Sequence, residues 1–278
     1  MPDLSLLPTW YVPTAVFALG AIVGSFLNVV IYRFHTGRSL TGRSHCLSCG
    51  AGLRWFELVP LASYLMLHGR CRHCGSWVPV RYLLVEGATA LLFFLALLVS
   101  DGVVEFLLLA AFSALGVVII AYDIYHYVIP NEFVCAALIL ALLQHGWWWY
   151  HGVPLGELAL AVPAAVAGSM FFFILWYLSR GQWLGFGDVK LALPLGLAVG
   201  ASGVFSVVVL SFWIGAAVSV GLVAYWWLRQ RGQPALQFGD RPLTMKSAVP
   251  FAPFLVASYL TVRFFHIDVL TLLTHVPG

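Results

Sequence analysis

Long apolar runs dominate the chain and predict its elements. Eight of them are predicted spans, and all but the short sixth one approach the roughly 20 residues that an α-helix needs to cross a bilayer. They cover residues 12–32, 82–100, 103–122, 132–150, 157–178, 189–201, 204–228 and 248–267. Prolines fall in or at the ends of several runs, where neighbouring helices can satisfy the backbone groups that proline leaves free. The pattern predicts an all-α, polytopic membrane protein with about eight transmembrane helices.

The composition supports this fold class. Of the 278 residues, 62% are hydrophobic and only 9% are charged, whereas a soluble domain carries about 25% charged residues. A soluble globular domain is therefore excluded. The order of the runs predicts three parts, namely a first transmembrane helix over 1–32, a loop over 33–81 and a transmembrane core over 82–278.

The positions of the basic residues predict the orientation in the membrane. Segments 33–81, 179–190 and 229–247 together hold 13 of the 14 Lys and Arg. With eight spans, all three segments lie on one side. Because cytoplasmic loops carry the excess of Lys and Arg, both termini are expected outside and the long loop in the cytoplasm. Aromatic runs such as 147–150 lie where interfacial belts are expected.

The cytoplasmic loop contains four of the five cysteines in two Cys-x-x-Cys pairs, Cys46 with Cys49 and Cys71 with Cys74. Two such pairs can each hold one edge of a tetrahedral zinc ion, and a site with four cysteine ligands is structural. Disulfides are the alternative, but thiols on the cytoplasmic side stay reduced. The pattern predicts a Zn-ribbon-like four-Cys loop. His45 and His73 adjoin the ligands and could replace one of them, although exposed loop histidines are the simpler interpretation.

Other polar positions allow ordinary explanations. Gly20, Gly24 and Asn28 share one helix face, which favours close helix packing and a hydrogen bond between helices. Glu57 and Glu86 are candidate ligand-binding acids, or simply interfacial charges. Cys135 lies within a span and is most simply a small buried hydrophobic residue.

Two acids at the membrane edge are the strongest candidates for chemistry. Asp123 ends the third predicted span and Asp188 begins the sixth, so both are expected at the cytoplasmic face. Two carboxylates held close cannot both ionise readily, which suits one to activate water and the other to donate a proton. The alternatives are a helix cap at Asp188 with an incidental acid at Asp123, or a proton pathway in a transporter. A non-catalytic assembly factor is a third possibility.

Residues next to the acids could support them. Gly185 and Gly187 flank Phe186 immediately before Asp188, and glycine allows a substrate backbone to approach closely. His126 and Lys190 could hold the acid side chains or adjust the local charge.

Several ordered motifs resemble the type IV prepilin peptidases, also called prepilin leader peptidase/N-methyltransferases, which are intramembrane aspartyl proteases of the GxGD type. The resemblance covers nearly the whole chain. It rests on segments 24–33, 58–63, 69–75, 80–86, 123–131, 185–190 and 250–254. Leu47 and Leu58 depart from residues common in the family, Pro and Asn respectively, and both lie outside the two acid motifs.

The resemblance implies a specific activity. Such enzymes cleave a basic leader from type IV prepilins or type II secretion pseudopilins at the cytoplasmic face of the bacterial inner membrane. Asp123 and Asp188 would be the catalytic pair. The same protein would then methylate the new N-terminus with S-adenosylmethionine, an activity that the cysteine loop accompanies. The expected partners are these substrates and membrane lipid, and nucleic acid is not among them.

Overall fold

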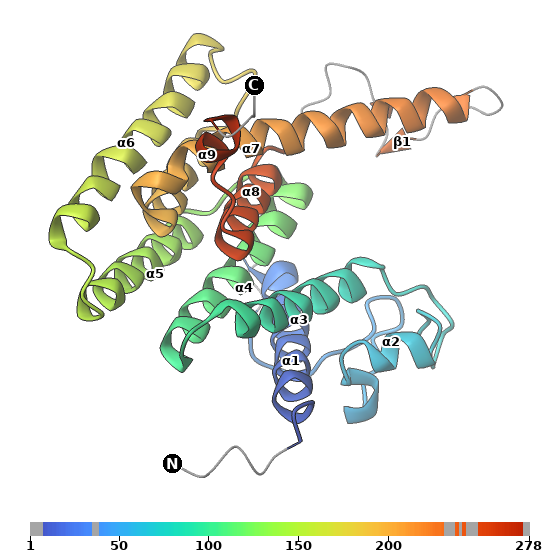
Figure 1. The fold of residues 1–278 in the computed structure, drawn as a ribbon. Coiled ribbons are helices and arrows are strands. Elements are labelled where there is room, and N and C mark those ends of the chain that lie inside the picture. Colours follow the sequence, from blue (N-terminus) through green and yellow to red (C-terminus); the bar gives the residue numbers. More distant parts are fainter. Residues whose placement is uncertain (1–7, 35–38, 231–236, 239–240, 243–249, 275–278) are drawn as a thin grey trace. The chain divides into compact units, whose positions relative to one another are not determined.

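The computed structural model describes residues 8–34, 39–230, 237–238, 241–242 and 250–274. Three of the basic residues from which the orientation was predicted lie outside these residues, namely Arg38, Arg231 and Lys246. The described chain is mainly helical, as predicted (Figure 1). Its elements are α1 (Tyr11–Arg33), η2 (Trp55–Leu58), α2 (Ala62–Met66), α3 (Arg81–Val99), α4 (Val103–His126), α5 (Asn131–Tyr150), α6 (Leu155–Leu178), α7 (Phe186–Gln230), β1 (Gln237–Phe238), β2 (Arg241–Pro242), α8 (Ala252–Phe265) and α9 (Val269–Thr274).

Six helices among the described residues are long and apolar enough to cross a membrane, namely α1 and α3 to α7. Two predicted spans, 189–201 and 204–228, fall within the single 45-residue element α7. Gly200 interrupts it with a non-helical backbone (φ 75°, ψ 175°), a conformation essentially restricted to glycine. The predicted span 248–267 corresponds to α8, which has only 14 residues. Phe251 is its N-cap, and its C-cap, His266, has a left-handed conformation.

The chain divides into two compact units, residues 1–122 and 123–278. In the first unit α1 packs against α3, and glycines on α1 form the contact. A Cβ at Gly20 would lie 2.7 Å from Ala90 Cα, and one at Gly24 would lie 2.7 Å from Glu86 Cα. Asn28 Nδ2 donates to the backbone oxygen of Tyr82 at 3.1 Å. The predicted packing face and its hydrogen bond between segments are therefore confirmed.

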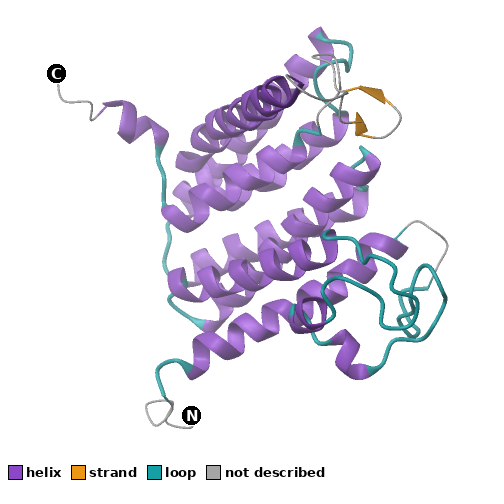
Figure 2. Ribbon diagram, turned by 90° about the vertical axis from the view of Figure 1, so that its right-hand side faces the viewer, coloured by secondary structure: helices purple, strands orange, loops and turns teal. Residues whose placement is uncertain are grey.

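Most of the segment between α1 and α3 is irregular, as Figure 2 shows by its long teal trace. The exceptions are the single turn η2 and the short helix α2. Leu61, which precedes α2, has a positive φ of 60°. This segment carries the cysteine pairs.

The second unit is organised around α7, against which α5, α6 and α8 pack. Small residues bring α6 and α7 together, since a Cβ at Gly196 would lie 3.1 Å from Ala165 Cα. Farther along, the Phe172 ring stacks on Phe212 at 6.0 Å between centroids and contacts Phe251. Outside the helices, β1 and β2 form an antiparallel pair in which Gln237 lies opposite Pro242.

Candidate functional site

The short turn before α7 positions Asp188. The helix begins at Phe186, so Asp188 is its third residue rather than its N-cap. Its Oδ2 accepts a hydrogen bond from the Gly185 backbone N–H at 3.2 Å. This contact matches the acidic half of a capping box, in which the third residue reaches back to the chain before the helix. The alternative that Asp188 is a helix N-cap is therefore wrong in position, because Asp188 caps the helix from its third residue. This cap accounts for only one of the two carboxylate oxygens.

Asp123 lies in the last turn of α4 and belongs to the same unit as Asp188. Both side chains are buried, with 6% and 5% of their surface exposed. The backbone amide of Ala252, at the start of α8, is a hydrogen-bond partner of the Asp123 carboxylate. The two carboxylates are close enough to interact electrostatically. Three elements therefore bring the two acids into one buried site.

Each acid keeps one oxygen without a partner. Asp123 Oδ2 and Asp188 Oδ1 are buried and have no hydrogen-bond partner among the described residues. Buried polar atoms are normally hydrogen-bonded, so an orphaned pair needs an explanation. A water molecule or a substrate group between the acids would supply one.

The neighbouring residues have different surroundings from those expected. Lys190 Nζ donates to Asn131 Oδ1 at 2.7 Å, at the start of α5. A Cβ at Gly187 would lie 3.1 Å from the side chain of Ile129, which gives that glycine a packing reason. His126 is exposed at the end of α4. Sequence reasoning missed the Asn131 contact and the Ala252 amide, because both depend on segments far apart in the chain.

The four cysteines of the first unit form one cluster. The sulfurs of Cys46, Cys49, Cys71 and Cys74 all lie within 4.8 Å of one another, and those of Cys46 and Cys74 are 3.9 Å apart. Four sulfurs about 2.3 Å from a tetrahedral metal would be about 3.8 Å apart. The donor set and its spacing therefore fit a metal ion. The neighbouring His45 instead places Nδ1 3.4 Å from the Arg43 backbone oxygen.

Two equivalent backbone turns build the cluster. In the first, the Cys46 N–H donates to Ala51 O and the Gly50 N–H donates to Cys46 O, both at 2.9 Å. In the second, the Cys71 N–H donates to Ser76 O at 2.8 Å and the Gly75 N–H donates to Cys71 O at 2.9 Å. Gly50 and Gly75 have positive φ, 73° and 71°, as such tight turns require. Each pair is thus a pre-shaped half of the site.

These turns also favour the thiolates that metals bind. The pKa of Cys46 is lowered to about 6, because backbone N–H groups of Cys49 and Ser48 point at its sulfur. The pKa of Cys74 is lowered by the Ser76 hydroxyl and backbone. Sequence reasoning did not identify Ser76, although it directly follows Gly75. Desolvation and the neighbouring cysteine sulfurs instead raise the pKa of Cys49 to about 11. The turns therefore favour the thiolate, which is the form that binds metals, at Cys46 and Cys74.

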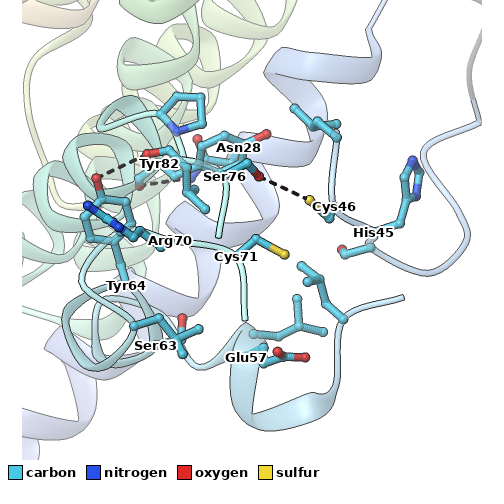
Figure 3. Close-up of a pocket in the computed structure, with 18 of the residues that line it drawn as sticks. Asn28, His45, Cys46, Glu57, Ser63, Tyr64, Arg70, Cys71, Ser76 and Tyr82 are labelled. Atoms are coloured by element: carbon cyan, nitrogen blue, oxygen red, sulfur yellow. Dashed lines mark hydrogen bonds between the residues drawn. The ribbon is translucent and has the colours of Figure 1, made fainter. Parts of the chain in front are cut away.

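A cavity of about 210 Å³ lies beside the cluster in the same unit (Figure 3). Glu57 and Glu86 both line it, as do the cluster residues Cys46 and Cys71. The two carboxylates are buried, and each has one oxygen held by a backbone N–H. Glu57 Oε2 accepts from Arg54 at 2.7 Å, and Glu86 Oε2 accepts from Leu61 at 2.8 Å. The candidate ligand-binding acids therefore share one cavity.

Two family descriptions match consecutive parts of the chain. Residues 18–100 match the bacterial peptidase A24 N-terminal domain, and residues 107–220 match the type IV leader peptidase family. No solved structure matches.

Curated relatives extend the match to most of the chain. A prepilin leader peptidase/N-methyltransferase of Burkholderia pseudomallei is 34% identical over 93% of this chain and 87% of its own length. A type 4 prepilin-like proteins leader peptide-processing enzyme of Escherichia coli is 34% identical over 79% and 86%. The Vibrio cholerae prepilin leader peptidase/N-methyltransferase is 30% identical over 77% and 91%. The chain therefore belongs to the prepilin leader peptidase/N-methyltransferase family.

Proposed function

We propose that this membrane protein cleaves the leader from type IV prepilins or type II secretion pseudopilins with Asp123 and Asp188 as its catalytic pair. The observation that carries the proposal is the pair of buried carboxylate oxygens without partners among the described residues. A purely structural pair would be expected to satisfy both oxygens of each acid. The family supplies the substrate class, and the two acids supply a means of hydrolysis.

In this mechanism one acid is ionised and the other is protonated. The ionised carboxylate removes a proton from water, which attacks the carbonyl carbon of the scissile peptide bond. The protonated carboxyl donates to the carbonyl oxygen as the tetrahedral intermediate forms. As the C–N bond breaks, the leaving amine takes up the proton that the first carboxylate removed from water, and the second acid regains a proton from the intermediate's hydroxyl. Neighbouring acids in a dry site are suited to these opposite roles. The backbone N–H of Gly185 holds Asp188 in place throughout.

Replacement of either acid tests the mechanism. Asp123→Asn and Asp188→Asn should each lower the cleavage rate by at least about a thousandfold, because general acid–base catalysis contributes factors of this size. Mass spectrometry of a purified prepilin substrate gives the rate. Asp101→Asn, at an exposed loop acid, is the matched control and should cleave normally. Wild-type cleavage by either active-site variant would overturn the mechanism.

The competing proton-relay function makes a different prediction. A transporter would move protons across liposomes and would leave prepilin intact. The same purified protein can be assayed for both, so one preparation separates the two functions.

We further propose that S-adenosylmethionine binds in the cavity beside the four cysteines. When bound, this donor supplies a methyl group on a sulfonium, and it also carries an ammonium group. The buried carboxylates of Glu57 and Glu86 would balance these positive charges. Such acids are costly to bury without a cationic partner. The cavity is partly open, and Arg33, Arg70 and Arg72 line it beside the two acids. It therefore offers partners for both the ammonium and the carboxylate of the donor.

Methyl transfer to processed pilin tests this second activity. Glu86→Gln should weaken donor binding by about tenfold, as expected for the loss of one charge-assisted contact. Isothermal titration with S-adenosylmethionine measures binding, and labelled methyl transfer measures turnover. The control is Glu157→Gln, at an exposed acid on α6. Equal binding by wild type and Glu86→Gln would exclude this carboxylate from the donor site.

The four cysteines are proposed to hold one structural zinc ion, since four thiolates leave no open position for water. The protein is further proposed to reside in the bacterial inner membrane, with the cysteine loop and acid pair in the cytoplasm and both termini in the periplasm. The distribution of basic residues supports this orientation.

A further inference from the structure

A groove of about 520 Å³ opens on the second unit between α5, α6 and α7. Each helix contributes one face to it. On α7 the lining residues are Phe186, Val189, Lys190 and Leu193, spaced as neighbours on one side of a helix. The α6 face, which includes Met170, follows the same spacing. The lining is mainly apolar, with one cation at the beginning of α7.

The groove is separate from the acid pair. Neither Asp123 nor Asp188 lines it. At 100° per residue, Asp188 is roughly 150° around α7 from the centre of the groove face. The groove is therefore not simply an extension of the proposed catalytic site.

Contacts fix the cation at the groove rim. Lys190 Nζ donates to Asn131 Oδ1 at 2.7 Å and lies 5.2 Å from the centroid of the Phe186 ring. That ring in turn packs against Trp176 at 5.0 Å. An ammonium carries three donors and Asn131 accepts one, so the group can still bind an anion.

We propose that the groove binds one anionic phospholipid, with an acyl chain along the apolar lining and the headgroup phosphate at Lys190. Two observations carry this choice. The lining belongs to helices long and apolar enough to lie in a bilayer, where lipid chains are the available apolar ligand. The cation stands at the end where α5 and α7 begin, so charge and apolar surface are arranged as in an anionic amphiphile. Basic pockets between transmembrane helices bind such headgroups.

Cys135 supports the same interpretation. It was expected to be a buried hydrophobic residue, but it is exposed and lines the groove on α5. The prediction was wrong because hydropathy does not distinguish a face packed on protein from one that faces lipid. Its side chain adds to the surface that an acyl chain would cover.

Photolabelling tests the proposal on the full-length protein. The protein is reconstituted in phosphatidylcholine vesicles containing phosphatidylglycerol with a diazirine in its acyl chain. Peptide mapping should place the adducts on the groove faces of α5 and α6. Phosphatidylglycerol should label these positions more strongly than a phosphatidylcholine probe, a comparison that needs no variant.

Two pairs of variants test the headgroup contact and the acyl-chain contact separately. Lys190→Gln should weaken phosphatidylglycerol binding by about fivefold, since one basic residue near a membrane surface contributes about 1 kcal/mol. Arg180→Asn removes an exposed cation ten residues before Lys190 that does not line the groove. Its φ is positive, which asparagine tolerates, and the variant should leave binding unchanged. Met170→Trp should narrow the groove at its α6 face and weaken labelling by both probes. Ile174→Trp, at an exposed position on α6 outside the groove, should not.

Three results would overturn the proposal. The first is equal labelling by the two probes in wild type, and the second is undiminished labelling of the groove in a folded Met170→Trp protein. The third is displacement of the lipid by a prepilin peptide that crosslinks to the same positions, which would make the groove a substrate site.

Discussion

The two carboxylate oxygens of Asp188 have different surroundings. Oδ2 accepts from the backbone before α7, whereas Oδ1 is buried without a partner among the described residues. A helix cap explains the first oxygen and leaves the second unexplained. The sequence predicted that Asp188 is catalytic. It did not indicate which oxygen the backbone holds and which remains available for chemistry.

The glycines on either side of Phe186 should respond differently to substitution. A Cβ at Gly187 would lie 3.1 Å from Ile129, tighter than ordinary contacts, whereas one at Gly185 would meet Asp188 Oδ2 at 3.4 Å. Gly187→Ala should therefore displace Asp188 and lower kcat for cleavage, by up to about a hundredfold for a 1 Å shift. Gly185→Ala should have a smaller effect.

Steady-state cleavage of a prepilin peptide by both variants measures the difference. A matched loss in kcat for the two alanine variants would contradict the packing explanation. It would favour the interpretation in which both glycines make room for substrate.

At the scale of elements, hydropathy predicted most helices closely. The expected spans 12–32 and 82–100 differ by one residue at each end from the helices found, and 132–150 differs by one residue at its start only. Whether a segment can cross a membrane depends on the total hydropathy of about 20 consecutive residues, so the sequence of that segment alone is enough to predict it. The two cysteine pairs could also be predicted as metal ligands, because the two ligands of each pair lie within four consecutive residues.

Contacts between distant segments could not be predicted in the same way. Apart from the small-residue face of α1, the helices are apolar on every side, so no hydrophobic periodicity marks the face that packs. The exposure of Cys135, the Lys190–Asn131 hydrogen bond and the Ala252 amide at Asp123 all depend on which faces meet. The cavity shared by Glu57 and Glu86 likewise joins residues 29 positions apart.

The paired cysteine turns predict metal dependence. Wild type should carry about one zinc per chain, and Cys46→Ser should lose it, because a structural site needs all four ligands. Cys135→Ser removes a cysteine outside the cluster and should keep the metal. Elemental analysis of the purified proteins gives the metal content. Full zinc occupancy in Cys46→Ser would rule out a site that depends on this ligand.

At the scale of the whole molecule, the two proposed activities fall in different units. The cysteine cluster and the cavity lie within residues 1–122, and the acid pair lies within 123–278. Two cluster cysteines also line the cavity wall. Loss of the metal should therefore affect methylation before it affects cleavage.

This separation can be measured with Cys46→Ser. Methylation of already processed pilin should fall by at least about tenfold as the cavity wall loses its metal. Cleavage of intact prepilin should change by less than about threefold, because the acid pair lies in the other unit and independent sites contribute additively. Parallel assays on one preparation give both rates, and Asp188→Asn provides the opposite pattern. An equal loss of both activities in Cys46→Ser would show that the units act as one.

The interruption at Gly200 bears on how many times α7 crosses the membrane, and therefore on whether α7 begins and ends on the same side. An unbroken helix of 45 residues would be about 68 Å long, more than twice the hydrocarbon thickness. A single crossing would place Lys190 and the basic segment after α7 on opposite sides of the membrane. Two crossings joined at Gly200 return the chain to the side from which it started. The proposed orientation therefore depends on two crossings that meet at Gly200, a residue without a side chain.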